Sequence, residues 1–131
     1  MRRLSLGLMA AIALLTAVLT APTASAADGT FAVWNVTNGS RCEWSGNAPT
    51  LGSCTNKIYL LQNSGYPCSG CDWVRLYWGT NYTGAYYCVP PGQTLGQPTS
   101  PNVRFNKGSG LSGYNQVIWS NAASAKWSGP C

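Results

Sequence analysis

Residues able to do acid–base chemistry are scarce in this chain. It contains no histidine, and its only acidic residues are Asp28, Glu43 and Asp72. General acid–base catalysis near neutral pH usually uses histidine or a carboxylate with a tuned pKa, and a nucleophilic Ser or Cys needs an adjacent base. Glu43 and Asp72 could form the carboxylate pair of a glycosidase. In a chain with so few acidic residues, however, any two carboxylates would match this requirement, so the match is weak evidence. The sequence predicts a protein that is not an enzyme and needs no cofactor.

The cysteines offer a second kind of chemistry. Cys68-Ser69-Gly70-Cys71 has the redox spacing Cys-x-x-Cys, but a thioredoxin-like role needs a helix N-terminus and a βαβ context, and neither is visible. Zinc would need more Cys or His ligands than an oxidised, His-free chain provides. We therefore expect no metal site and a structural role for all six cysteines: Cys42, Cys54, Cys68, Cys71, Cys88 and Cys131.

An even number of cysteines in an exported chain predicts three disulfides. Six cysteines allow fifteen pairings, among which sequence alone does not choose. Cys42 with Cys54 is the first pairing to expect because it closes one local loop. Cys131 is expected to pin its end of the chain through Cys88 or Cys71.

The N-terminal segment has the three regions of an export signal: Arg2 and Arg3, an apolar stretch over 4–19, and the small residues 24–26. Removing residues 1–26 leaves 105 of the 131 residues, which suits a single domain over 27–131. We expect a secreted, extracellular monomer with no membrane segment after the signal is removed.

Charge argues against nucleic acid as a partner. Without Arg2 and Arg3, six basic residues face three acidic ones, a net charge of +3. The six are scattered along the chain, whereas binding phosphates requires clustered Lys and Arg.

The remaining pattern is all-β. Short runs of β-branched and aromatic residues predict strands at 31–36, 57–61, 73–78, 85–89 and 116–119. Turn signals rich in Gly, Pro and Asn separate them, and 96–102 reads as an extended loop. Regularly spaced short strands indicate a sandwich or a barrel.

One stretch resembles a known family. Residues 77–84 read aromatic, four residues, aromatic, one residue, glycine, with Tyr77, Tyr82 and Gly84 at those positions. This resembles the Greek-key signature of βγ-crystallins. Asn81–Ala85 and the later Asn121-Ala122-Ala123-Ser124 are also similar to segments of secreted peptidase inhibitors of streptomycetes, of the metalloproteinase-inhibitor kind. The resemblance covers 73–127 and implies a small disulfide-stapled Greek-key sandwich, with Asn121 and Ser124 as its second polar element.

Calcium is another ligand that the resemblance suggests. The stretch 120–125 lacks the carboxylate and the final Ser of the βγ-crystallin calcium site, and calcium prefers six to eight oxygens that usually include carboxylates. We expect Asn121 and Ser124 to cap a turn instead.

The resemblance implies a rigid loop that inhibits an extracellular peptidase, with metallopeptidases as the candidate class. Ser64, Gly65, Tyr66 and Pro67 are the reactive-loop candidates, with Tyr66 as anchor. An alternative is a carbohydrate- or cell-wall-binding module that uses surface Trp. Residues 87–93 also resemble a stretch of α-amylase inhibitors, although the Trp-Arg-Tyr triplet of that family is absent. An antimicrobial, toxin-like role is a further alternative.

Overall fold

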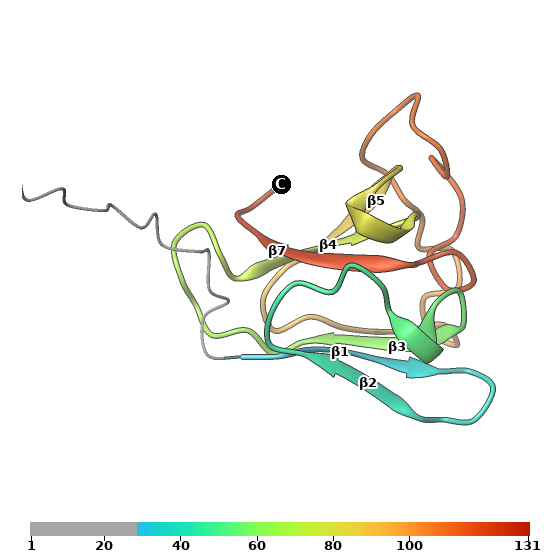
Figure 1. Ribbon diagram of the computed structural model, residues 1–131, viewed down its shortest axis with the longest axis horizontal. Helices are drawn as coiled ribbons and strands as arrows, with labels where there is room; N and C mark the ends of the chain where they lie inside the picture. The colour runs from blue at the N-terminus through green and yellow to red at the C-terminus, as the bar shows by residue number, and fades with distance from the viewer. Residues whose placement is uncertain (1–28) are drawn as a thin grey trace, which may run out of the picture.

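Two antiparallel sheets make up the computed structural model, which describes residues 29–131 (Figure 1). The four-stranded sheet has the order β2-β1-β3-β6, and the three-stranded sheet has the order β5-β4-β7. The strands are β1 (Phe31–Asn35), β2 (Arg41–Trp44), β3 (Ile58–Asn63), β4 (Trp73–Tyr77), β5 (Tyr86–Val89), β6 (Thr94–Gly96) and β7 (Ser124–Ser128). The predicted signal over 1–26, and Asp28, lie outside the described residues.

The core lies between the two sheets, which Figure 1 shows stacked one above the other. Side chains alternate across each strand, so Phe31 and Val33 of β1 and Val74 and Leu76 of β4 point into the same apolar cluster. Trp119, at 1% exposed, is the largest fully buried side chain. The all-β prediction is confirmed, and two 3₁₀ turns, Gly52–Cys54 and Thr80–Tyr82, are the only helical elements of residues 29–131.

Four of the five predicted strands are present as β1, β3, β4 and β5. The predicted strand at 116–119 is wrong. That segment has one isolated bridge, between Val117 and Arg104, and then turns, because the backbone N–H groups of Asn121 and Ala122 both donate to the Ile118 carbonyl. Ile118 and Trp119 are apolar because this turn is packed into the core, so their side chains reflect burial and not an extended backbone.

All six cysteines fall within the described residues and form three disulfides: Cys42–Cys54, Cys68–Cys71 and Cys88–Cys131. The predicted Cys42–Cys54 bond is confirmed, and Cys131 takes Cys88 of its two expected partners. Disulfides persist in oxidising compartments, so the bonds support a location outside the reducing cytosol. Within 29–131, no helix has the length and apolar character needed to cross a membrane.

Candidate functional site

The predicted reactive loop connects β3 to β4 and leaves the body of the protein at one end of both sheets (Figure 1). Ser64, Tyr66 and Pro67 are exposed. Tyr66 is 63% exposed, the most of any large apolar side chain among the described residues. An aromatic ring held in solvent at a loop tip is a ready contact for a partner, since Tyr is enriched among binding hot spots.

One fully buried amide holds the two ends of this loop together. The Asn63 side chain is 0% exposed. Its Nδ2 donates to the Asp72 carbonyl at 2.9 Å and to the Val89 carbonyl at 3.0 Å, and its Oδ1 accepts from the Gly65 N–H at 2.9 Å. Asn63 therefore joins Gly65 near the start of the loop to Asp72 at its end, and it also links β3 to β5 of the other sheet.

Further contacts fix the rest of the loop. The Ser64 N–H donates to the Thr30 carbonyl at 2.9 Å. A Cβ on Gly65 would approach the Trp127 ring to 2.7 Å, so only glycine fits against that ring. After the tip, the Cys68–Cys71 disulfide constrains the segment that leads back to β4. The Cys68 N–H also donates to Asp72 Oδ2 at 3.3 Å. Tyr66 is thus displayed on a segment constrained on both sides.

A second cluster contains four of the five residues of the predicted fold motif. The Tyr77 and Tyr82 rings meet edge to face with centroids 6.0 Å apart. Ser124, which is fully buried, accepts a hydrogen bond from the Tyr82 N–H at 3.0 Å and donates one to the Gly79 carbonyl. These two hydrogen bonds of Ser124 hold the 79–82 turn against the start of β7. Burial first, and the neighbouring Tyr77 second, raise the pKa of the Tyr82 phenol.

Gly84 completes this corner, and its replacement by valine is expected to destabilise the protein by about 3 kcal/mol. Its φ is +81°, and a Cβ there would lie 2.8 Å from the Ser112 carbonyl oxygen. Gly92→Val is the matched control because φ is +77° but nothing lies within 4 Å of the Cβ position. Chemical denaturation should show Gly84→Val as the more destabilised variant. Equal losses would mean that backbone strain alone, and no close packing, requires glycine at position 84.

Asn121, the fifth motif residue, lies in the turn that precedes β7. Its Nδ2 donates to the Val117 carbonyl at 3.0 Å, as expected for a turn-capping side chain. It borders a hollow of about 380 Å³ whose lining is neutral: Thr55, Asn56, Trp78, Gly79, Thr80, Thr83, Asn121 and Ala123. No carboxylate is available there to bind a cation, and no cluster of three or more His, Cys, Asp or Glu occurs in residues 29–131.

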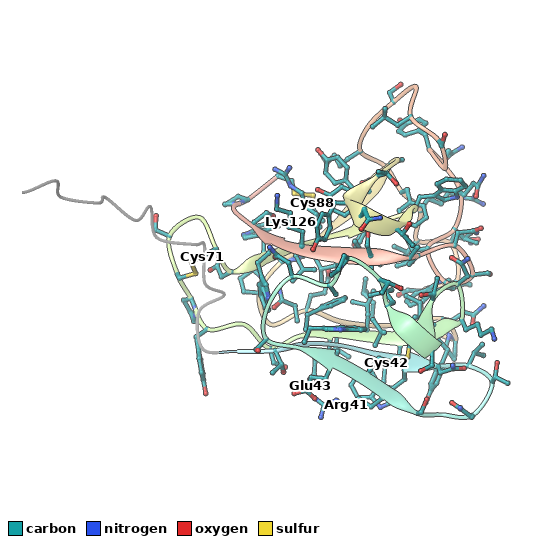
Figure 2. All side chains as sticks on the ribbon, viewed as in Figure 1. Arg41, Cys42, Glu43, Cys71, Cys88 and Lys126 are labelled. Atoms are coloured by element: carbon teal, nitrogen blue, oxygen red, sulfur yellow. A yellow bond between two sulfur atoms is a disulfide. The ribbon has the colours of Figure 1, made fainter. Side chains whose placement is uncertain are left out.

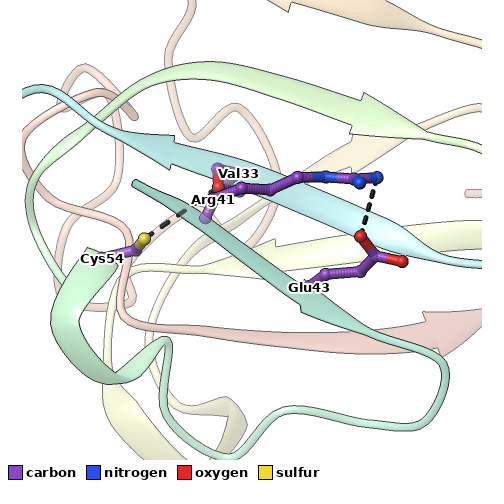
Figure 3. A network of polar contacts seen from close by, with 4 residues as sticks. All are labelled: Val33, Arg41, Glu43 and Cys54. Atoms are coloured by element: carbon purple, nitrogen blue, oxygen red, sulfur yellow. Dashed lines mark hydrogen bonds and ion pairs between the residues drawn. The ribbon is translucent and has the colours of Figure 1, made fainter. Parts of the chain in front are cut away.

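Glu43 and Asp72, the only carboxylate side chains in the described part of the chain, are each engaged elsewhere. Glu43 forms an ion pair with Arg41, also on β2, with 2.7 Å between the guanidinium nitrogen and the carboxylate oxygen (Figure 3). Asp72 is the last residue of the reactive loop, which connects the two sheets, and its Oδ2 accepts a hydrogen bond from the Cys68 N–H. The Cys54 sulfur in Figure 3 lies 4.0 Å from the Val33 carbonyl oxygen. That sulfur carries no proton in its disulfide, so the approach is a packing contact.

The tryptophans are largely enclosed. Trp119 and Trp127 are buried, and the other four, Trp34, Trp44, Trp73 and Trp78, are half-buried. Asn63-Ser64-Gly65 has the composition of a turn, so the sequence predicted a loop here but not the structural role of Asn63. Only the structure shows that its amide is buried.

Fold and site together define a small all-β protein with three disulfides and one strongly constrained exposed loop. Comparison with protein-family models, with curated proteins and with solved structures found no match to this chain.

Proposed function

We propose that this protein is a secreted inhibitor of an extracellular peptidase, built on a βγ-crystallin-like Greek-key domain. The Ser64–Pro67 segment enters the cleft of the peptidase, with Tyr66 as its anchor. The observation that carries the proposal is the combination of a tyrosine exposed at the tip and a loop base held by the buried Asn63 amide.

The contacts at its base hold the Ser64–Pro67 segment in one conformation before it binds. A loop already held in one conformation loses little conformational entropy on binding, so more of the contact energy appears as affinity. Both flanks of the tip are constrained, by Asn63 on one side and by the Cys68–Cys71 disulfide on the other. The same constraints would keep a bound loop from relaxing after attack by a peptidase, which favours inhibition over cleavage.

The resemblance of Asn81–Ala85 and Asn121–Ser124 to segments of secreted peptidase inhibitors supports the same class of function. Metallopeptidases are the first class to test. The carbohydrate-binding alternative depends on surface tryptophan, and no tryptophan of this protein is among its exposed residues. The loop is therefore the better-supported site.

Tyr66→Ala is expected to weaken inhibition by about 1 kcal/mol or more, which is about fivefold in the inhibition constant, because the anchor ring is lost. The measurement is an inhibition assay against a panel of secreted metallo- and serine peptidases. Tyr114→Ala, which removes a ring that is 44% exposed elsewhere on the surface, is the control and should leave inhibition unchanged. Circular dichroism should show both variants folded.

Two results would contradict the proposal. Equal potency of wild type and Tyr66→Ala would remove this loop as the inhibitory segment. Failure of the wild-type protein to inhibit any peptidase of the panel would overturn the inhibitor assignment itself.

A further inference from the structure

The outer face of the three-stranded sheet carries cations packed on a row of tyrosines. Tyr77 lies between Tyr82 and Tyr86, with ring centroids 6.0 and 5.3 Å away. The Arg75 guanidinium lies 5.2 Å from the Tyr86 ring centre, and the Lys126 ammonium lies 5.6 Å from that of Tyr82. We call this surface the basic face; it comprises Trp73, Arg75, Tyr82, Tyr86, Lys107 and Lys126, and the buried Tyr77 ring packs against its two tyrosines.

Strand register explains why these residues share one face. Arg75 of β4 is directly opposite Lys126 of β7, and Tyr77 is directly opposite Tyr86 of β5. Val74 and Leu76, which alternate with them, point into the core. Lys107 pairs through its backbone with Tyr86 and so adds a third cation at the edge of the face. Figure 2 shows Lys126 on the side of the molecule opposite Arg41 and Glu43.

Within residues 29–131, no carboxylate side chain lies within ion-pair distance of the cations of this face. Like charges directly opposite each other on neighbouring strands destabilise a sheet, and Arg75 and Lys126 are such a pair. Among the described residues the one ion pair joins Arg41 to Glu43 on the other sheet. The Nε of Arg75 is buried and has no hydrogen-bond partner in the part of the chain that the structure describes. The protein thus retains an unfavourable charge arrangement that a bound anion would neutralise.

The composition and position of the face indicate a protein as the source of that anion. Trp, Tyr and Arg are the residue types enriched in protein–protein interfaces and among their hot spots. The face begins where the reactive loop ends in sequence, because Trp73 follows Asp72 and begins β4.

We propose that the basic face binds a carboxylate-bearing segment of a partner protein, through the planar guanidinium of Arg75 and the ammonium of Lys126. Guanidinium groups match carboxylates in a two-point geometry, and lysine adds a second positive charge. The proposal rests on the proposed function in one respect: the acidic segment belongs to the inhibited peptidase, beside its cleft.

The face can be tested without any peptidase. A hexaglutamate peptide titrated into the whole protein at low salt should shift NMR signals of β4 and β7. The Arg75→Gln/Lys126→Gln variant should lose at least about fivefold in affinity, because it removes two positive charges whose attraction for the peptide is little screened at low salt. Lys57→Gln/Arg104→Gln removes the same charge elsewhere and should bind almost as wild type.

Lys126→Glu is a second, independent variant, since it gives Arg75 an internal carboxylate directly across the strands. It should abolish hexaglutamate binding while the protein stays folded. Equal losses for the two double variants, or signal shifts spread over the whole surface, would overturn the proposal in favour of net charge. Tighter binding of an oligogalacturonate than of hexaglutamate would overturn the protein segment as occupant.

If the inhibition assay identifies a peptidase that this protein inhibits, its association rate provides a further test. Arg75→Gln/Lys126→Gln should slow association by about tenfold at low salt, because complementary charge mainly accelerates encounter. An unchanged association rate would overturn the placement of the acidic segment on the peptidase. If no peptidase is inhibited, the proposed function fails while the hexaglutamate titration still decides the face.

Discussion

Replacing Asn63 with alanine is expected to lower the free energy of unfolding by at least about 3 kcal/mol. The change leaves the Asp72 and Val89 carbonyls and the Gly65 N–H without their partner. Each buried polar group left unsatisfied costs about 1–3 kcal/mol, and the amide volume is lost from a fully buried position. Guanidinium denaturation monitored by tryptophan fluorescence would measure the loss.

Gln62→Ala is the control for this experiment. Gln62 precedes Asn63, is half-buried, and its side chain forms no hydrogen bond within residues 29–131. It should cost about 0.5 kcal/mol or less, as is usual for surface positions. A loss below about 1 kcal/mol for Asn63→Ala would show that water replaces the amide and that Asn63 does not fix the loop.

Removing the Cys88–Cys131 disulfide, by Cys88→Ala/Cys131→Ala, should destabilise the protein by about 4 kcal/mol. The bond joins residues 43 apart in sequence, and restricting so long a segment removes much conformational entropy from the unfolded chain. Neither cysteine is buried, so little packing is lost with the sulfur atoms. Thermal and chemical unfolding, with mass spectrometry to confirm the two remaining disulfides, provide the measurement.

Cys68→Ala/Cys71→Ala is the matched control, because that disulfide spans a sequence separation of 3. The same chain-entropy relation gives about 1.6 kcal/mol for so short a loop. If both variants lose the same stability, loop closure is not the origin of the effect. Cys68→Ala/Cys71→Ala should instead act mainly on inhibition, since it frees one flank of the Tyr66 loop.

Local sequence was sufficient for the elements whose side-chain types match their backbone. β-branched and aromatic runs marked β1, β3, β4 and β5 because such residues pack well on a pleated, half-buried surface. The short separation of Cys42 and Cys54 indicated their bond. The motif placed a glycine at position 84, where φ is positive and a residue with a Cβ would be strained.

Strand prediction from local sequence failed where a segment is buried without being extended, or extended without being apolar. Ile118 and Trp119 resemble a strand but form a buried turn. β2 alternates Arg41 and Glu43 with Cys42 and Trp44, which by composition resembles a loop, and it becomes a strand because its backbone pairs with β1. β6 and β7 are likewise defined by pairing with β3 and β4.

For the candidate site, sequence determined which side chains are available: a chain without histidine, with few acids, six cysteines and a Ser-Gly-Tyr-Pro segment. Tertiary structure decided what those residues do. It buried the Asn63 amide beneath the loop and, through the β4–β7 register, set Arg75 opposite Lys126, which the sequence had left among scattered charges. Composition and turn chemistry act over a few neighbouring residues, whereas strand register is set by packing between segments far apart in the chain.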